Sequence, residues 1–349
     1  MSTSTRSYFR RLAEGGEDGP LAKCLYPVLR ISSAAYGMGI KTFRLLYEKK
    51  VFPRRRLPFP VISVGNLSWG GTGKTPFVEY LARRFKDRGL ATLILTRGYA
   101  QDEVEQIRHH LPDTLIGVGR DRYRVAREMA GKHKIDIAIL DDGFQHWPLE
   151  RDLEIVALNA LNPFGNGRLL PLGILREPPS LLRKADILMM THTNLVSSSE
   201  LEKLRDQIKK HAPQALVVES YLEPLFFYRA RKRIRVPLNK LQNQKVATFS
   251  AVGAPRSFQL LLSRLQTRPV RNFEFTDHHV FSEKELREIK EVSDSVSIGE
   301  VITTEKDFYR CPQAISDILN PLVLATRLRL SSGEEPLMGK IFRLFEGRS

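Results

Sequence analysis

The segment SWGGTGKTP, residues 68–76, restricts the fold of this chain more than any other feature. Loops of the form G-x-x-x-x-G-K-[ST] bind phosphate because backbone N–H groups without a nearby Cβ point at the anion. The lysine reaches the β- and γ-phosphates, and the Ser/Thr hydroxyl binds Mg²⁺. Ser68 replaces the first glycine of the pattern, and a serine fits there if its φ is negative. The predicted nucleotide-binding residues are Ser68, Trp69, Gly70, Gly71, Thr72, Gly73, Lys74 and Thr75.

The residues around this loop have the pattern that a working phosphate loop needs. A short apolar run, Val61–Val64, predicts a buried strand before the loop, and Thr75–Arg88 reads as an amphipathic helix after it. Further apolar runs alternate with helix-like segments along the chain. The runs predicted as strands are residues 92–95, 115–118, 135–140, 154–158, 187–190 and 215–218. Apolar strands joined by helices indicate a parallel sheet covered on both faces.

The pattern predicts an α/β fold with two domains. A P-loop NTPase-like parallel-sheet domain is expected over residues 53–219, and a smaller α/β domain over 243–349. Alternating aromatic and basic residues predict a linker at 220–242, and residues 1–52 form a separate N-terminal segment. The second βα pattern begins at Val246.

The formal net charge of +16 favours an anionic partner such as a nucleic acid, an acidic membrane or a phosphorylated substrate. The chain has no zinc-finger spacing or aromatic RNA-binding signature, so we expect no nucleic-acid partner. Its two cysteines have no metal or redox spacing, which favours a reduced cytosolic setting. The sequence shows no secretory signal and no apolar run of roughly 18 to 20 residues, the length that spans a bilayer.

The N-terminal segment mixes apolar, aromatic and basic side chains between Leu21 and Phe52. This mixture suits a helix in a membrane interface, with its basic groups at anionic headgroups. An amphipathic helix packed on the protein's own core is the alternative, and Gly37 and Gly39 weaken a helix in either case.

Two carboxylates follow the predicted strand at 135–140. A phosphate-loop enzyme needs a carboxylate at the end of a neighbouring strand to hold the metal ion or its water. Asp141 and Asp142 stand at this place and, with Thr75, are the predicted metal ligands. Spacing alone does not decide which aspartate contacts Mg²⁺ directly.

Several blocks of the sequence resemble the tetraacyldisaccharide 4'-kinase family, the lipid A 4'-kinases of Gram-negative bacteria. The blocks occur in the family's order over residues 61–310. They are SVGNLSWGGTGKTPFVEYLA, TRGYA, DDGFQHWPLERDLEIVALNA, NPFGNGRLLPLGILREPPSLLRKAD, FSAVGAPRSF, DHHVFSEKEL and ITTEKDF.

The resemblance implies transfer of the γ-phosphate of ATP, with Mg²⁺, to the 4'-hydroxyl of a tetraacylated glucosamine disaccharide 1-phosphate, which gives lipid IVA. It implies peripheral attachment to the cytoplasmic face of the bacterial inner membrane through an N-terminal helix. It also implies two α/β domains joined by a two-stranded linker, with catalysis in the cleft between them. The partners expected are this phospholipid and the anionic membrane surface, and no obligate protein partner is expected.

The resemblance also assigns roles to individual residues. Lys74 neutralises the transferring phosphate. The family's catalytic base is an aspartate in a Gly-Asp-Glu-Pro segment, and here Gln101-Asp102-Glu103-Val104 keeps only the Asp-Glu core. Asp102 is the expected base, and a solvated loop carboxylate is the alternative. A histidine pairs with this base in the family; we assign His278, while His279 is a candidate packing residue.

Other residues of the matching blocks are expected to line the cleft. The candidates for substrate binding are Gln145, His146, Arg176 and Glu177. Arg176 is a candidate phosphate ligand, with an ion pair to Glu177 or another carboxylate as the alternative. The block Thr304–Asp307 is expected at the nucleotide or the domain interface without a named role.

Two other functional classes stay open from the residues themselves. One is a P-loop NTPase that acts as a metallochaperone or assembly switch and binds a protein partner. Such a protein is expected to carry Cys/His metal clusters, which the sequence does not show. The other is a nucleic-acid-dependent ATPase, which is supported only by the formal net charge of +16.

Overall fold

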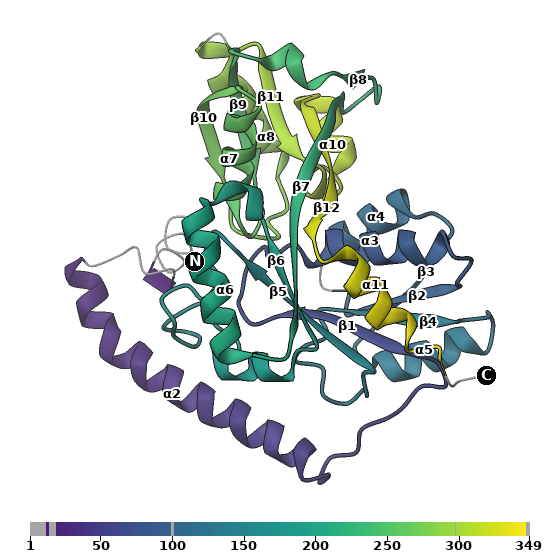
Figure 1. The fold of residues 1–349 in the computed structure, drawn as a ribbon. Coiled ribbons are helices and arrows are strands. Elements are labelled where there is room, and N and C mark those ends of the chain that lie inside the picture. The colour runs from purple at the N-terminus through teal and green to yellow at the C-terminus, as the bar shows by residue number, and fades with distance from the viewer. Residues whose placement is uncertain (1–11, 14–18, 99–100, 297, 347–349) are drawn as a thin grey trace. The chain divides into compact units, whose positions relative to one another are not determined.

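The computed structural model describes residues 12–13, 19–98, 101–296 and 298–346. The chain forms two compact units (Figure 1). The first unit contains Met1–Tyr99, His110–Tyr221 and Leu330–Ser349, and the second contains Ala100–His109 and Leu222–Arg329. The chain passes from the first unit to the second along β7 (Leu216–Arg229) and returns along β12 (Leu322–Ser332). These units are defined by contacts, and the boundaries predicted along the sequence stay a prediction.

The sheet of the first unit has the strand order β7-β6-β5-β1-β4-β2-β3, and neighbouring strands run parallel. Its other strands are β1 (Val61–Asn66), β2 (Thr92–Thr96), β3 (Leu115–Val118), β4 (Ile137–Asp141), β5 (Leu153–Asn159) and β6 (Ile187–Thr191). Every residue of β1, β4, β5 and β6 is buried. Continuous apolar strands therefore form the buried parallel sheet that the sequence predicts.

Helices cover this sheet and bury their apolar faces against it. The helix α3 contacts β1, β2 and β4, and α5 contacts β2 and β3. The helices of the first unit are α2 (Pro20–Glu48), α3 (Lys74–Lys86), α5 (Arg122–Ala130), α6 (Ser198–His211) and α11 (Glu334–Phe342), with 3-10 turns η1 (Pro179–Lys184) and η2 (Thr193–Leu195). Buried residues on both faces of the sheet form the core of this unit.

The second unit has the strand order β10-β9-β11-β12-β7. The pairs β10·β9, β9·β11 and β11·β12 are parallel, whereas β8 pairs with β7 in the antiparallel direction. Its remaining strands are β8 (Arg235–Val236), β9 (Lys245–Ser250), β10 (Arg268–Glu274) and β11 (Glu300–Thr304). Its helices are α4 (Gln101–His110), α7 (Pro255–Arg264), α8 (Glu283–Ser295), α9 (Glu305–Phe308) and α10 (Pro312–Ile318), with the turn η3 (Leu238–Leu241).

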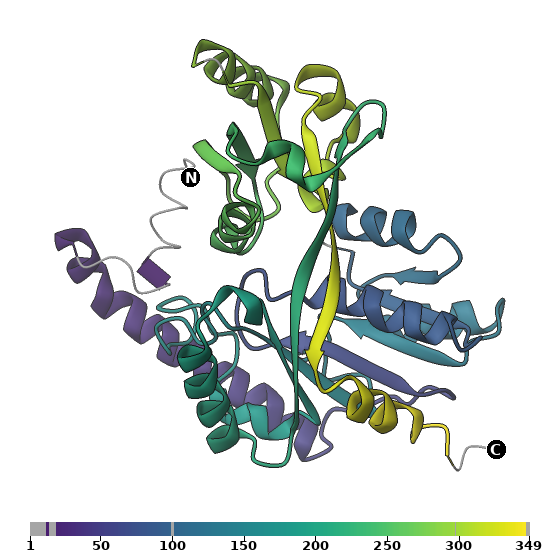
Figure 2. The same cartoon turned by 45° about the horizontal axis from the view of Figure 1, so that its top comes forward.

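The N-terminal segment contains the long helix α2, which lies along the outside of the first unit (Figure 2). One side of α2 contacts this unit: Ser33 Oγ donates to the Leu169 carbonyl at 2.9 Å, and Tyr36 Oη donates to the Arg176 carbonyl at 3.3 Å. Other apolar side chains of α2 are exposed to solvent. We call five of these exposed residues, which lie on the side of the helix away from the unit, the apolar face of α2: Leu21, Val28, Ile31, Met38 and Leu45. Within the described residues, no helix is both long enough and apolar enough to cross a membrane.

Candidate active site

The glycine-rich loop between β1 and α3 has the backbone shape that its pattern requires. Gly70 has φ +116° and Gly73 has φ +75°, values that residues with a side chain rarely adopt. Ser68 is not among the described non-glycine residues with positive φ, so serine fits the first position of the loop. Ser68 is buried and bridges to Leu175, whereas the neighbouring Trp69 is 54% exposed. The loop is therefore intact although its first glycine is replaced.

Side chains at the ends of neighbouring strands bind the carbonyl groups of this loop. Asn159 Nδ2, at the end of β5, donates to the Gly71 carbonyl at 3.2 Å. Thr191 Oγ1, at the end of β6, donates to the Thr72 carbonyl at 3.1 Å. In a trans peptide the N–H group points opposite to the carbonyl, so the N–H groups of Thr72 and Gly73 point away from these strands. Gly73 is also the N-cap of α3, and no side chain caps this helix. These N–H groups fit a phosphate group.

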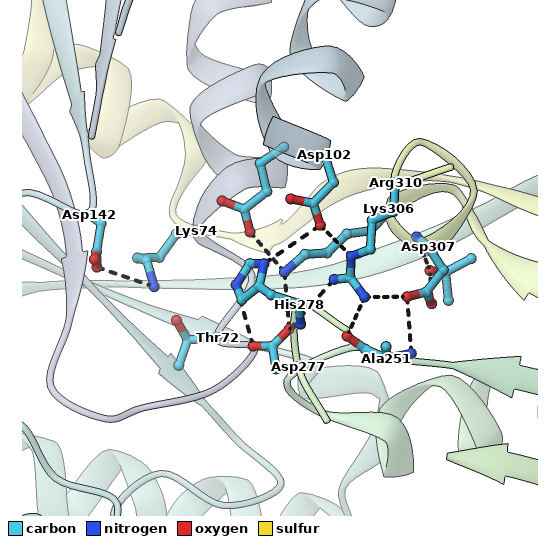
Figure 3. Close-up of polar contacts among 12 residues, drawn as sticks. Thr72, Lys74, Asp102, Asp142, Ala251, Asp277, His278, Lys306, Asp307 and Arg310 are labelled. Atoms are coloured by element: carbon cyan, nitrogen blue, oxygen red, sulfur yellow. Dashed lines mark hydrogen bonds and ion pairs between the residues drawn. The ribbon is translucent and has the colours of Figure 1, made fainter. Parts of the chain in front are cut away.

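Asp142 contacts two cations beside the loop. Lys74 Nζ lies 3.5 Å from Asp142 Oδ1 (Figure 3), and Arg176 Nη1 lies 2.9 and 3.0 Å from the two carboxylate oxygens. Arg176 also donates to Gln145 Oε1 at 3.1 Å, and Gln145 Nε2 donates to the Asn66 carbonyl at 2.8 Å. Burial raises the pKa of Asp142, but Lys74 and Arg176 together lower it to about 2. Asp142 is therefore a carboxylate at neutral pH, and it is the ion-pair partner of Arg176.

The predicted metal ligands lie at adjacent ends of β1, β4 and α3. Asp141 is the last residue of β4 and is paired in register with Val64 of β1, while Thr75 lies in the first turn of α3. No group of three or more His, Cys, Asp and Glu side chains in the described ranges could hold a metal ion. Mg²⁺ in nucleotide sites is bound by few protein ligands together with phosphate oxygens and water. Thr75, Asp141 and Asp142 therefore fit a Mg²⁺ ion that binds with a nucleotide.

A buried arginine, which the sequence patterns did not single out, lies next to this group. Arg122 begins α5 and is 5% exposed, and its Nη1 lies 3.1 Å from His146 Nδ1. Burial and then the charge of Arg122 lower the pKa of His146 to about 4, so this histidine is neutral at physiological pH. Burial also lowers the pKa of Arg122, against the attraction of Asp142 and Asp141. Only a contact in three dimensions reveals Arg122, because it belongs to no sequence motif.

Glu177 lies apart from the Asp142 group, beneath α2. It is 1% exposed, and its Oε2 has no hydrogen-bond partner among the residues that the structure describes. Burial raises the pKa of Glu177 to about 7 although Arg44 and Lys184 act in the opposite direction. The structure therefore separates Glu177 from the neighbouring Arg176, whose partner is Asp142.

The second group of predicted residues lies in the second unit. Asp102 is in the first turn of α4 and is 5% exposed, so it is a buried helix residue and not a solvated loop carboxylate. His278 Nδ1 lies 3.6 Å from Asp102 Oδ2, and His278 Nε2 lies 3.7 Å from Asp277 Oδ2 (Figure 3). His278 has φ +61°, an uncommon value for a residue other than glycine. His279 instead stacks on Phe275 and contacts Glu285 at 3.0 Å.

Two cations of the second unit contact these carboxylates. Arg310 Nε donates to Asp102 Oδ2 at 2.7 Å, and Lys306 Nζ lies 2.8 Å from Glu103 and 3.4 Å from Asp277. Burial raises the pKa of Asp102, but His278, Arg310 and Lys306 outweigh burial and hold it well below its usual range. Lys306 belongs to the matching block 304–307, which places this block beside Asp102. Arg310 follows the block and was not predicted.

Comparison with known proteins identifies the family to which this site belongs. The model of the family described as "Tetraacyldisaccharide-1-P 4'-kinase" matches residues 25–344. The chain belongs to this family. It is 35% identical to "Probable tetraacyldisaccharide 4'-kinase, mitochondrial" of Arabidopsis thaliana, over 89% of this chain and 88% of that protein. It is 33% identical to the tetraacyldisaccharide 4'-kinase of Halothermothrix orenii, over 88% of each chain.

A solved member of the family has the same fold. The crystal structure of LpxK from Aquifex aeolicus in complex with ATP aligns with a TM-score of 0.68 and 29% identity, over 93% of this chain and 99% of that one. The predicted α/β fold of P-loop NTPase type is thus confirmed. The chain is a kinase of the lipid A pathway, its family acts on a lipid disaccharide, and its cofactors are ATP and Mg²⁺.

Proposed function

We propose that this chain transfers the γ-phosphate of ATP to the 4'-hydroxyl of a tetraacylated glucosamine disaccharide 1-phosphate and so forms lipid IVA. The observation that carries the proposal is the phosphate loop: the N–H groups of Thr72 and Gly73 point away from the ends of β5 and β6, and Lys74 and Asp142 lie beside the loop. Phosphoryl transfer gains most from positioning and charge stabilisation, and this group of residues supplies both.

The residues beside the loop divide the work on the donor. The N–H groups of the loop and the N-terminus of α3 bind the phosphates. Lys74 turns from Asp142 to the transferring phosphate, while Arg176, with its 2.9 and 3.0 Å contacts, keeps Asp142 in place. Thr75, Asp141 and Asp142 would hold Mg²⁺, which supplies charge neutralisation for the phosphates when bound.

Asp102 and His278 act on the acceptor as a proton-accepting pair. A sugar hydroxyl is a weak nucleophile, and a positioned base removes its proton as the new bond forms. Gln145, His146, Arg176 and Glu177 are proposed as substrate-binding residues. Among them, Arg176 is the strongest candidate for binding an anionic group, because its side chain, beside Asp142, is 26% exposed.

The proposed location is the cytoplasmic face of the inner membrane, with α2 lying in the lipid interface. The apolar face of α2 is exposed, although the opposite side of this helix contacts the first unit through Ser33 and Tyr36. Exposed apolar residues mixed with Lys23, Arg30 and Lys41 on the same helix favour an anionic membrane as the partner. The substrate is a lipid and is delivered by the same membrane.

The test is a kinase assay with γ-labelled ATP and the tetraacyldisaccharide 1-phosphate in detergent micelles. We expect one labelled phosphate per disaccharide, attached at the 4' position, and an activity loss of at least about 100-fold in Lys74→Ala. The matched control is Lys86→Ala on the same helix, since Lys86 is exposed and forms an exposed ion pair with Asp113. An unlabelled disaccharide, or full activity of Lys74→Ala, would refute the proposal.

A further inference from the structure

One buried histidine of the first unit has no part in the proposed reaction. His192 follows the last residue of β6 and is 5% exposed. Its φ is +58°, a value that strains a residue with a Cβ. Burial lowers the pKa of His192 to about 4, so the ring is neutral at physiological pH. A strained residue persists only where its surroundings hold it, so its contacts point to its role.

The imidazole of His192 contacts the hydroxyl group of Thr191, the last residue of β6. His192 Nδ1 lies 3.1 Å from Thr191 Oγ1. The same oxygen lies 3.1 Å from the carbonyl oxygen of Thr72 in the phosphate loop and 3.3 Å from that of Leu158 in β5. Thr191 is 3% exposed, so these groups meet in the protein interior. One buried hydroxyl group therefore connects His192 to the phosphate loop.

The tautomer of His192 decides how this hydroxyl group is used. A threonine hydroxyl has one proton to donate and can accept from another donor, and a neutral imidazole carries its proton on one nitrogen only. If Nδ1 lacks the proton, it competes with the carbonyl groups for the hydroxyl proton. If Nδ1 carries the proton, it donates to Thr191 Oγ1, and the hydroxyl proton is left for the carbonyl oxygens, of which that of Thr72 is the nearer.

The carbonyl group of Thr72 matters for ATP because of the peptide group that contains it. This group is planar and trans, so its carbonyl and the N–H of Gly73 point in opposite directions. A donor that holds the carbonyl therefore fixes the N–H toward the phosphate position. The methyl group of Thr191 supports the same peptide, because a Cβ added at Gly73 would lie 3.1 Å from Thr191 Cγ2.

A second strand end holds the side chain of Thr72. Asn66, the last residue of β1, donates from Nδ2 to Thr72 Oγ1 at 2.9 Å. Asn66 is fully buried and Thr72 is 3% exposed. With its side chain fixed to β1, Thr72 depends on β6 for the direction of its carbonyl group.

We infer that His192 is a positioning residue for the phosphate loop. Its Nδ1–H donates to Thr191 Oγ1 and so directs the Thr191 hydroxyl at the Thr72 carbonyl. The N–H of Gly73 then points at the phosphate before ATP arrives, and binding does not have to order it. The inference deepens the donor half of the proposed function and rests on it.

The tautomer can be measured directly in the ligand-free wild-type protein. Nitrogen-15 NMR at neutral pH distinguishes a protonated imidazole nitrogen from an unprotonated one. The chain contains eight histidines, so the signals of His192 are assigned by their loss in His192→Asn. We expect the proton on Nδ1, and a proton on Nε2 instead overturns the inference.

ATP binding tests the positioning role. His192→Gly removes the donor and relieves the strained φ, so we expect the Kd for a non-hydrolysable ATP analogue to rise about tenfold in calorimetric titration. His192→Asn should keep Kd within about threefold of wild type, because asparagine tolerates this φ and carries an N–H donor on Cγ, as histidine does. The control is Gln266→Gly, since Gln266 is exposed in the second unit and has φ +57°. Equal Kd values for His192→Gly and His192→Asn contradict the positioning role.

A double-mutant cycle tests whether His192 acts through Thr191. Thr191→Val keeps the shape of the side chain but lacks the hydroxyl, so its Kd should also rise about tenfold. Adding His192→Gly to Thr191→Val should then raise Kd by no more than about twofold. Independent losses, which would multiply to about 100-fold, overturn the inference. Urea unfolding shows which variants are folded, and if these variants fail to fold, the tautomer in the wild-type protein still decides.

These measurements are separate from the kinase assay because they need no acceptor lipid. If the wild-type protein leaves the disaccharide unphosphorylated but the Kd values follow the expected pattern, the proposed function fails and the role of His192 stands. If the disaccharide is phosphorylated but the proton lies on Nε2, the role of His192 fails and the proposed function stands.

Discussion

Replacing Gly73 with alanine is the most direct test of the phosphate loop. Gly73 has φ +75°, and a left-handed conformation costs a residue with a Cβ about 1–2 kcal/mol. The new Cβ would lie 3.1 Å from Thr191 Cγ2, which is tighter than an ordinary contact. Alanine also restricts the unfolded chain and so recovers about 0.4–1 kcal/mol. We therefore expect the free energy of unfolding to fall by only about 1 kcal/mol.

The effect of this substitution on ATP binding should be much larger. If residue 73 relaxes to negative φ, the peptide groups on both sides of it rotate, and their N–H groups no longer point at the phosphate. A hydrogen bond to a charged group contributes about 1.5–3 kcal/mol. The loss of one such bond raises the Kd for ATP roughly 10- to 150-fold.

Gly89 provides the matched control for Gly73. Its φ is +71°, almost the same, but an added Cβ meets no atom within 4 Å. Urea unfolding should show similar losses of stability in Gly73→Ala and Gly89→Ala. Calorimetric titration with a non-hydrolysable ATP analogue should show weakened binding in Gly73→Ala alone. A Kd for Gly73→Ala within twofold of wild type would falsify our account of the loop.

Three further predictions concern Glu177, Trp69 and α2. Burial raises the pKa of Glu177 to about 7. The protonated side chain therefore stabilises the fold fully below its ordinary pKa, and this stabilisation is lost as pH rises through 7, by at most roughly 3 kcal/mol of unfolding free energy at pH 9. Denaturant unfolding of Glu177→Gln should not show this loss. A wild-type pH profile parallel to that of Glu177→Gln contradicts this. The chain has two tryptophans, the buried Trp147 and the exposed Trp69 of the loop, so Trp147→Phe leaves Trp69 as the single tryptophan. The fluorescence of Trp69 should then change when ATP is added, and this change should disappear when Lys74 is also replaced. Replacing Val28, Ile31 and Met38 together with serine should reduce flotation of the protein with anionic vesicles. Replacing the exposed Val270, Val280 and Val292 of the second unit with serine is the control and should leave flotation unchanged. Equal flotation of the two variants refutes the membrane role of α2.

The parts of the fold that depend on local sequence were predictable. β1, the phosphate loop and α3 follow one another within 26 residues, Val61–Lys86, and each has its own pattern of apolar or glycine residues. The ends of β4 and β1 lie together because parallel neighbours in a sheet place their carboxyl ends at one edge. The position of Asp141 and Asp142 near the loop therefore follows from the order of strands and loops alone.

The environment of Asp102 was not predictable, because distant residues create it. Its flanking sequence is largely polar and is equally compatible with a solvated loop. In the structure, Arg310 and Lys306, more than 200 residues later, bind Asp102 and Glu103, and these pairs hold the start of α4 in the second unit. The neighbouring segments of the chain belong to the first unit, so no pattern along the sequence reveals this assignment.

The two groups of charged residues use the same residue types in different ways. In each group an aspartate contacts one arginine, and a lysine lies nearby. Lys74 contacts the carboxylate of Asp142 at 3.5 Å, and Arg176 still neutralises this carboxylate when the lysine moves. Lys306 contacts Glu103 at 2.8 Å and Asp277 at 3.4 Å, and these carboxylates and Asp102 raise its pKa although burial lowers it.

Moving Lys74 and moving Lys306 away from their carboxylates therefore cost different amounts of free energy. Turning Lys74 toward a phosphate exchanges one long ion pair for contacts with a more highly charged group, and Asp142 keeps a partner. Turning Lys306 away removes its 2.8 Å contact with Glu103, whose side chain is 24% exposed, and leaves Asp277 with the longer contact of 3.8 Å to Arg310 Nη2. A partly buried charge that loses its closest partner is destabilising. Lys74 is thus available to a ligand, whereas Lys306 belongs with Arg310 to the fixed framework that keeps Asp102 and His278 together.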